Sequence, residues 1–253
     1  MSNLHESYRQ KLTVTQDLVV DPALRTYLLS VYNKVALGLI LAASLAYVTS
    51  SVPVARDLLF RTVTTAGAPR LAGLTSLGSL VTIAPILLLM FAGGALSKPS
   101  PLRTGALYWS VVALIGASMG LLVLAFTGAS IATTFVVSAA AFGGLSLTGY
   151  LTKKDLSGLG GFLATGVIGL IATLAVNLFL HSAAIFYVAN MAGVLIFAGL
   201  IAHNTQGLKL AFHQIGDDRA AVSAASNVGA LALFISFINL FQFLLLMMSG
   251  DRR

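Results

Sequence analysis

Apolar side chains are concentrated in seven long runs that are separated by polar or basic connections. Each run has roughly the 20 residues that a helix needs to cross a hydrocarbon core of about 30 Å. The runs lack the alternating polarity of barrel strands, and in lipid each must satisfy its own backbone hydrogen bonds, so helices are predicted. The pattern predicts an all-α integral membrane protein, a bundle of seven transmembrane helices in one membrane domain of residues 28–250. The helices are expected at about 28–50, 77–96, 105–126, 129–148, 158–180, 182–202 and 227–248.

The connections differ in length. Residues 127–128 and His181 form very short junctions, and short connections join antiparallel neighbours. The loop of residues 51–76 is longer and carries several arginines. In the connector of residues 205–226, apolar side chains fall close to one helical face, which predicts a short interfacial helix separate from the sixth run.

The composition agrees with a membrane protein. Hydrophobic residues make up 57% of the 253 residues and charged residues 9%, whereas soluble domains contain about 25% charged residues. The absence of cysteine excludes disulfides and thiolate metal sites. The net charge of +7 is better explained by basic loops that face a cytoplasm and its anionic lipid than by nucleic acid. The expected partner is therefore the lipid bilayer, with no nucleic acid.

The basic residues predict the orientation of the chain. If the polar N-terminal tail of residues 1–27 is cytoplasmic, nine lysines and arginines fall on that side and three on the other, as the positive-inside rule requires. Lys34, near the start of the first run, can extend its charge to the same face. Arg252 and Arg253 do not fit this charge pattern, because seven crossings that start from a cytoplasmic N-terminus place them on the opposite side of the membrane. The cytoplasmic set is Arg9, Lys11, Arg25, Lys98, Arg103, Lys153, Lys154, Lys209 and Arg219, and the opposite set is Arg56, Arg61 and Arg70.

Polar side chains at membrane depth are concentrated in the final third of the chain. Residues 203–206 (His-Asn-Thr-Gln) end the sixth run, and Ser236 and Asn239 lie in the seventh, whereas none of the runs contains Asp or Glu. Membrane proton relays and divalent-cation sites usually rely on carboxylates, so a tight Ca²⁺ site inside the bundle would be difficult to build. No metal-ligand spacing is present, and no cofactor is expected.

Small residues recur at four-residue spacing. Residues 116–120 (Gly-Ala-Ser-Met-Gly) match the G-x-S-x-G pattern of hydrolases, but that elbow follows a strand, and the candidate bases His181 and His203 lie at opposite ends of the sixth run. We therefore expect no enzyme and interpret this motif as a packing stripe. Gly161, Thr165 and Gly169 repeat the spacing, for which packing within the chain is favoured over dimerisation.

Short motifs occur along most of the chain in a recognisable order. The most specific are residues 149–157 (Gly-Tyr-Leu-Thr-Lys-Lys-Asp-Leu-Ser) and 237–241 (Phe-Ile-Asn-Leu-Phe). With these motifs the chain resembles the bacterial branch of the Bax inhibitor-1 family of seven-helix membrane proteins. Supporting stretches are Leu24-Arg25, Val31-Tyr32-Asn33, residues 36–39, Thr134-Phe135, Phe142-Gly143, Val176-Asn177, residues 195–200 and residues 204–206.

The resemblance implies a bundle whose last helix is central and wrapped by the other six. It also implies a non-enzymatic role, because family members are associated with Ca²⁺ leak, with cell-death suppression in eukaryotes and, in bacteria, with modulation of a membrane-anchored AAA protease. The expected protein is a regulator in a bacterial inner (plasma) membrane, with a membrane protease or other membrane proteins as partners. The alternative is a leak channel for calcium or other cations.

The sequence departs from the family at its expected gate. Family members usually have Tyr-Asp-Thr-Gln where this chain has residues 203–206, and Asp where it has Ser236. The two aspartates are the proposed gating pair, so the gating candidates here are Asn204, Ser236, His203 and Asn239, without the carboxylates. Asn204 and Ser236 could still share a hydrogen bond, but it would not titrate. A pH response would have to use His203, for which a plain interfacial role is the simpler alternative.

Overall fold

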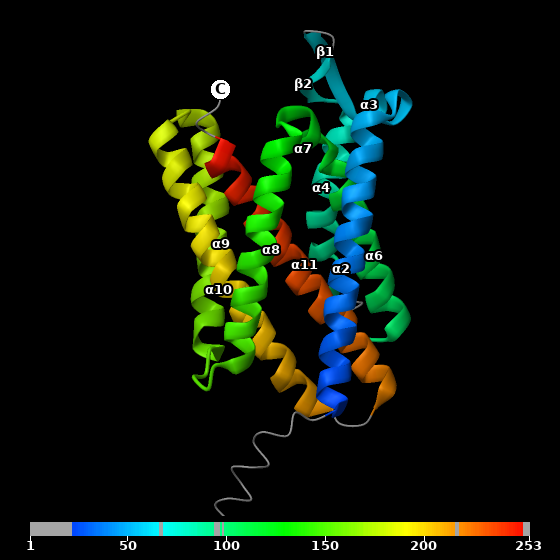
Figure 1. The fold of residues 1–253 in the computed structure, drawn as a ribbon, viewed down its shortest axis with the longest axis vertical. Helices are drawn as coiled ribbons and strands as arrows, with labels where there is room; N and C mark the ends of the chain where they lie inside the picture. The colour runs from blue at the N-terminus through cyan, green and yellow to red at the C-terminus, as the bar shows by residue number, and fades with distance from the viewer. Residues whose placement is uncertain (1–21, 66–67, 94–96, 98, 216–217, 250–253) are drawn as a thin grey trace, which may run out of the picture.

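A computed structural model describes residues 22–65, 68–93, 97, 99–215 and 218–249, so Arg9, Lys11, Lys98, Arg252 and Arg253 lie outside the described residues. Among these described residues, six spans are long and apolar enough to cross a membrane, and one of the six consists of two helices joined end to end. They lie side by side in a bundle, and a shorter apolar helix, α4, joins them (Figure 1). The spans are α2 (Pro22–Ser51), α6 with α7 (Pro101–Ser118, Gly120–Ala125), α8 (Gly128–Leu151), α9 (Ser157–Leu180), α10 (Ala183–Ile215) and α11 (Arg219–Ser249).

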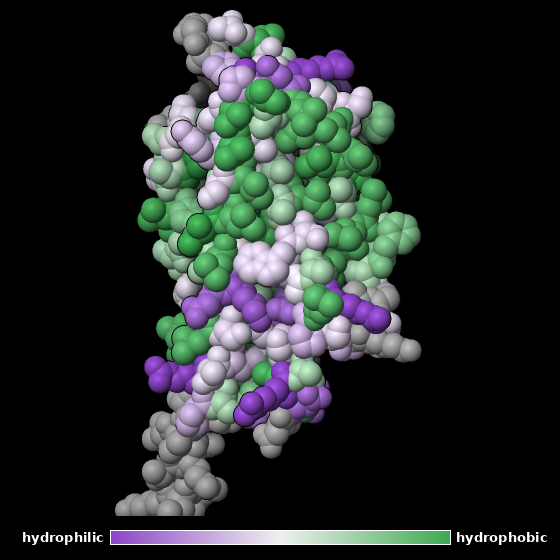
Figure 2. Space-filling model, turned by 90° about the vertical axis from the view of Figure 1, so that its right-hand side faces the viewer, coloured by the Kyte–Doolittle hydropathy of each residue, from purple (hydrophilic) through white to green (hydrophobic). Residues whose placement is uncertain are grey.

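The outer surface agrees with a membrane environment. Figure 2 shows a broad hydrophobic belt with hydrophilic side chains gathered above and below it. Large apolar side chains such as Phe162, Phe179 and Leu195 are exposed on the outside of α9 and α10. In water such a surface would be unfavourable, because soluble monomers rarely expose large contiguous apolar patches. The protein is therefore a multi-pass membrane protein.

Two of the expected spans differ in detail from the prediction. The span expected at 77–96 is α4 (Ser76–Met90), whose 15 residues extend about 22 Å and end in a turn at Phe91. The span expected at 105–126 is broken at Met119, where α6 ends and α7 begins. The hydropathy pattern does not show the early end of α4 or the break at Met119, because the residues at both places are apolar.

The long loop expected at 51–76 has a regular structure of its own. It contains α3 (Pro53–Leu59) and the antiparallel strands β1 (Phe60–Thr65) and β2 (Ala68–Leu74), with a bulge between Arg61 and Thr62. Isolated two-stranded hairpins are marginally stable, and here α3 and α7 pack against the two strands. The hairpin lies at the end of the bundle where α2 ends (Figure 1).

The expected break between the sixth span and an interfacial helix is wrong. α10 continues without interruption from Ala183 to Ile215, and α11 begins at Arg219, well before the expected start at about 227. The polar side chains of residues 203–206 do not end the helix, because they hydrogen-bond to neighbouring elements and leave the main chain of α10 intact.

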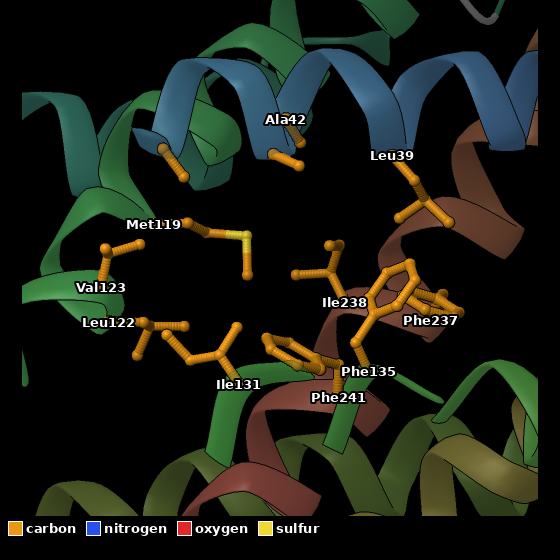
Figure 3. Close-up of a pocket in the computed structure, with 12 residues that line it drawn as sticks. Leu39, Ala42, Met119, Leu122, Val123, Ile131, Phe135, Phe237, Ile238 and Phe241 are labelled. Carbon is orange, nitrogen blue, oxygen red and sulfur yellow. The ribbon is translucent and has the colours of Figure 1, made fainter. Parts of the chain in front are cut away.

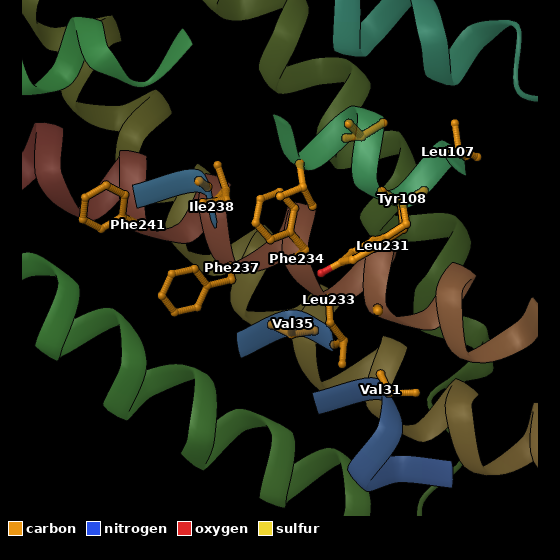
Figure 4. Close-up of a cluster of buried hydrophobic side chains, with 14 of the residues drawn as sticks. Val31, Val35, Leu107, Tyr108, Leu231, Leu233, Phe234, Phe237, Ile238 and Phe241 are labelled. Carbon is orange, nitrogen blue, oxygen red and sulfur yellow. The ribbon is translucent and has the colours of Figure 1, made fainter. Parts of the chain in front are cut away.

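Helix α11 is the most buried of the long helices. In its most apolar window 56% of the residues are buried, against 33% or fewer in the other spans. It packs against α2, α6, α8 and α10 and runs obliquely between them (Figure 1). Figure 4 shows Phe234, Phe237 and Tyr108 in the main apolar cluster. The core of the bundle is therefore built on α11.

The two small-residue stripes behave differently. A Cβ on Gly116 would lie 2.6 Å from the Cα of Ala42, and the Ser118 hydroxyl donates to the Ile115 carbonyl of its own helix at 2.8 Å. The first stripe thus brings α6 close to α2, as expected. The second does not pack within the chain: Gly161 and Gly169 have open space beside them and Thr165 is exposed.

Candidate functional site

The predicted contact between Asn204 and Ser236 is present. The Asn204 amide nitrogen donates to the Ser236 hydroxyl oxygen at 3.2 Å, and that hydroxyl donates to the Ala232 carbonyl at 2.8 Å. Ser236 is buried in α11, and Asn204 is half-buried in α10. A neutral hydrogen bond therefore joins the two helices where the family resemblance leads one to expect carboxylates.

The residues on either side of Asn204 contact other elements. The Thr205 hydroxyl lies 3.3 Å from the Tyr32 hydroxyl of α2. Nδ1 of His203 lies 3.1 Å from the Leu156 carbonyl oxygen, and because a carbonyl can only accept, Nδ1 carries the proton. The ring nitrogen thus anchors His203 to the connector between α8 and α9.

Gln206 makes the strongest link to the same connector. Its side-chain oxygen accepts from the Leu156 N–H at 2.7 Å, and its side-chain nitrogen donates to the Lys154 carbonyl at 2.8 Å. One turn further on, the Lys209 amine donates to the Tyr150 carbonyl at 2.8 Å and lies 4.8 Å from the centre of the Tyr150 ring. We call this set of contacts, made by His203, Gln206 and Lys209, the connector clamp.

Two glycines allow the close approach that the clamp requires. A Cβ on Gly149 would lie 2.9 Å from the carbonyl carbon of Ala202, in the backbone of α10. A Cβ on Gly160 would lie 2.9 Å from Cε1 and Nε2 of His203. Both glycines lie in or next to the motif of residues 149–157, so that motif and residues 203–206 form one structural unit.

The connector presents two lysines while its backbone is held. Lys153 and Lys154 are exposed. Asp155 accepts from the Ser157 N–H at 2.8 Å and so satisfies a free donor at the start of α9. The hydroxyl of Ser157, and then its N–H, hold the pKa of the Asp155 carboxyl below its ordinary value.

Asn239, the remaining candidate, is not joined to the Asn204–Ser236 pair. Its amide nitrogen donates to the Ile235 carbonyl of its own helix at 2.8 Å. A groove of about 590 Å³ instead lies between α10 and the first half of α11, and its lining includes His203 and Asn204. The groove reaches the inter-helix pair from the end of the bundle that carries the connector.

Sequence reasoning missed two polar clusters around the first turns of α11. The Lys34 amine and the Ser30 hydroxyl of α2 both contact the Ser226 hydroxyl, so Lys34 extends its charge towards α11 rather than along the lipid surface. Asn227 donates at 3.1 Å to the Thr104 hydroxyl of α6. The late start expected for the last helix placed Ser226 in a connector and Asn227 at the very start of that helix, so neither was expected to face another helix.

An apolar cavity of about 150 Å³ lies in the opposite half of the bundle. Met119 from the break between α6 and α7, Ile131 from α8 and Phe241 from α11 point into it (Figure 3). Among the described residues, no group of three or more His, Cys, Asp or Glu side chains could hold a metal ion. The polar contacts described here therefore lie at the Asn204–Ser236 pair, at the connector clamp and around the first turns of α11, away from this cavity.

The fold and the site define a class of protein, a polytopic α-helical membrane protein. Its two sequence motifs hydrogen-bond α10 to α11 and to the connector between α8 and α9. Residues 24–253 match the family described as "Inhibitor of apoptosis-promoting Bax1". Because this match spans nearly the whole chain, the protein belongs to that family, and the resemblance seen in the sequence is confirmed.

Three relatives are similar over nearly their full length. The chain is 53% identical to an uncharacterized protein of Caulobacter vibrioides over 253 residues, all of both chains. It is 37% identical over 240 residues to the inner membrane protein YbhL of Escherichia coli K12, which covers 94% of this chain and 97% of that protein. An uncharacterized protein of Rickettsia prowazekii is 35% identical over 247 residues, 97% of this chain and 98% of the relative.

Proposed function

We propose that this protein is a non-enzymatic regulator in the bacterial inner membrane, which acts by binding other membrane proteins through its α8–α9 connector. The observation that carries the proposal is the connector clamp. Gln206 and His203 together hold both main-chain groups of Leu156, and Gln206 also holds the Lys154 carbonyl. Two exposed lysines are thus presented on a fixed backbone. A fixed, charged loop loses little conformational freedom when it binds a partner.

The partner class follows from the family and from the position of the connector. A membrane-anchored protease of the AAA class would meet this surface from the cytoplasm, where the positive-inside pattern places Lys153 and Lys154. In this topology α4, which packs against α6, makes a seventh crossing around the central α11. The end of α11 then lies on the side opposite the start of α2, as in Figure 1.

A site-specific crosslinking experiment tests the regulator function. With a photo-reactive phenylalanine analogue in place of Lys154, we expect crosslinks in native membranes to a small number of discrete proteins, among them a membrane protease. The matched control is the same analogue at Arg103, an exposed basic residue in the first turn of α6 outside the clamp. Adducts with lipid alone at both positions would contradict the proposed docking surface.

A cation leak is the second candidate, and one observation favours it. The groove of about 590 Å³ reaches Asn204, whose amide is hydrogen-bonded to Ser236. A leak would use this groove as its entrance and the space around α11 as its path. The absence of carboxylates from the described spans gives a cation little to bind, so we place the regulator first.

The two candidates are separated by flux through purified protein in liposomes. We expect no Ca²⁺ flux above empty liposomes for the wild-type protein between about pH 6 and 8, because the pair at the end of the groove is neutral and does not titrate. The double change Asn204→Asp with Ser236→Asp is expected to produce flux that depends on pH. Ca²⁺ flux through the wild-type protein would favour the cation leak over the regulator. A double variant without flux would show that residues 204 and 236 do not gate a leak.

A further inference from the structure

A groove between α2 and α8 lies next to the contacts described so far and shares only Tyr32 and Tyr150 with them. Its volume is about 890 Å³, and it lies at the end of the bundle where α2 begins and α8 ends. Tyr32 and Phe142 meet edge to face across it, with ring centroids 6.2 Å apart, and Phe142 rests on Phe237 of α11 at 5.5 Å. The groove therefore has an aromatic floor, and its open side faces the surroundings of the bundle.

The lining changes from cationic to apolar along the helix axes. Arg25 lies in the first turn of α2 and is exposed, and none of the described acidic side chains forms an ion pair with it. Deeper in the groove the exposed lining side chains are apolar, with Leu29 on α2 and Leu147 on α8. Tyr150 lies at the transition, where the amphipathic ring of tyrosine is favoured in membranes.

One polar atom in this groove has no partner within the protein. The hydroxyl oxygen of Ser146 is buried, and no hydrogen-bond partner for it exists among the described residues. Ser146 lines the groove and lies one helical turn, about 6 Å, deeper than Tyr150. In a low-dielectric environment an unpaired hydroxyl is unfavourable, and many serines in membrane helices avoid this by bonding their own helix. The free hydroxyl thus indicates a ligand with a hydrogen-bonding group at this depth.

We propose that the groove binds one phospholipid with an anionic headgroup. The headgroup phosphate pairs with Arg25, a glycerol ester carbonyl accepts from the Ser146 hydroxyl, and one acyl chain continues past Ser146 over the aromatic floor of Tyr32 and Phe142. Phe142 lies one helical turn deeper than Ser146, so the cation, the hydroxyl and the floor follow one another in the order of phosphate, ester and chain in a lipid of the adjoining leaflet. Anionic lipids attract basic residues at the membrane surface, and the volume is within the range of about 300–1,000 Å³ that is common for ligand sites.

Two neighbouring glycines provide a matched pair of variants. Gly143 lines the groove and Gly144 does not, yet both are exposed, both lie in α8, and neither has an atom within 4 Å of its Cβ position. Gly143→Phe therefore has open space at its Cβ and places its ring in the groove, and Gly144→Phe places the same side chain outside it. Arg25→Gln removes the cation, with Arg103→Gln as the matched change on α6.

The test is native mass spectrometry of the full-length protein, purified in detergent and incubated with equal amounts of phosphatidylglycerol and phosphatidylethanolamine. We expect wild-type protein and Gly144→Phe to retain one phosphatidylglycerol, and Gly143→Phe to retain at least about tenfold less. Arg25→Gln should lose the preference for phosphatidylglycerol, whereas Arg103→Gln should keep it. Circular dichroism checks the fold, and Gly143→Leu replaces Gly143→Phe if the larger side chain prevents folding.

Other occupants of the groove give different results. Equal retention by the Gly143 and Gly144 variants would overturn the proposal, as would equal retention of the two lipids by the wild-type protein. A wild-type protein that retains no lipid, because residues 1–21 or a second copy of the chain fill the groove, would also overturn it. Ser146→Ala is expected to lower retention severalfold without loss of stability, since the hydroxyl has no partner within the protein.

Discussion

Gly149→Ala is expected to destabilise the protein by about 1–3 kcal/mol, the range that overpacking typically costs. A methyl group at this position would meet the main chain of α10 at Ala202, with the carbonyl carbon and Cα both 2.9 Å away. Backbone atoms cannot turn aside as a flexible side chain can, so α8 and α10 would have to separate. The separation would also displace the Tyr150 carbonyl that Lys209 holds. Unfolding of the detergent-purified protein by a denaturing detergent measures the change.

Gly144→Ala is the control for this prediction. Gly144 lies in the same helix with open space around its Cβ position, so the change removes only the conformational freedom of glycine. Alanine is favoured over glycine inside a helix by about 1 kcal/mol, and the variant is expected to be as stable as wild type or slightly more stable. Equal stability of the two alanine variants would show that the close approach of α8 and α10 contributes nothing.

The hydropathy pattern predicts the spans because it depends only on length and apolar content. It locates α8 and α9 within a few residues, since polar or glycine-containing junctions bound both helices. It fails for α10, which continues past His203 to Ile215 because the polar side chains find partners in other elements. It also misses strands β1 and β2, although residues 62–65 are all β-branched, because a loop outside the bilayer leaves no long apolar run.

One part of the candidate site could be predicted from the sequence, and the other part could not. The Asn204–Ser236 contact is predictable from the family, because aligned positions keep their places in a shared fold even when the residues change. The connector clamp is not predictable from spacing, since Gln206 and Leu156 are far apart in the chain and meet only when α8, α9 and α10 pack together. The sequence motifs mark residues 149–157 and 203–206 as family features. The physical reason, the hydrogen bonds between the two stretches, is seen only in the folded structure.

Gln206→Ala is expected to release the connector and to have the largest effect on the proposed docking surface. The change leaves the Leu156 N–H and the Lys154 carbonyl without their side-chain partner. The bond to Leu156 is partly buried and the bond to Lys154 is exposed, so the loss is expected to cost about 0.5–1.5 kcal/mol, the typical net contribution of a hydrogen bond. This corresponds to an increase of about 2- to 13-fold in local opening. Hydrogen exchange of the Leu156 amide reports this opening directly, because local opening exposes the amide to solvent.

Two further variants isolate the cause of the exchange. Gln206→Glu keeps an oxygen to accept from Leu156 and loses the donor to Lys154, so the Leu156 amide should stay more protected than in Gln206→Ala. Gln214→Ala removes the same side chain from an exposed position near the end of α10 and should leave exchange at Leu156 unchanged. If the Gln206 and Gln214 variants exchange equally, Gln206 does not hold the connector. If exchange rises in Gln206→Ala but crosslinking from position 154 persists, the clamp is structural and partner binding does not depend on a fixed connector.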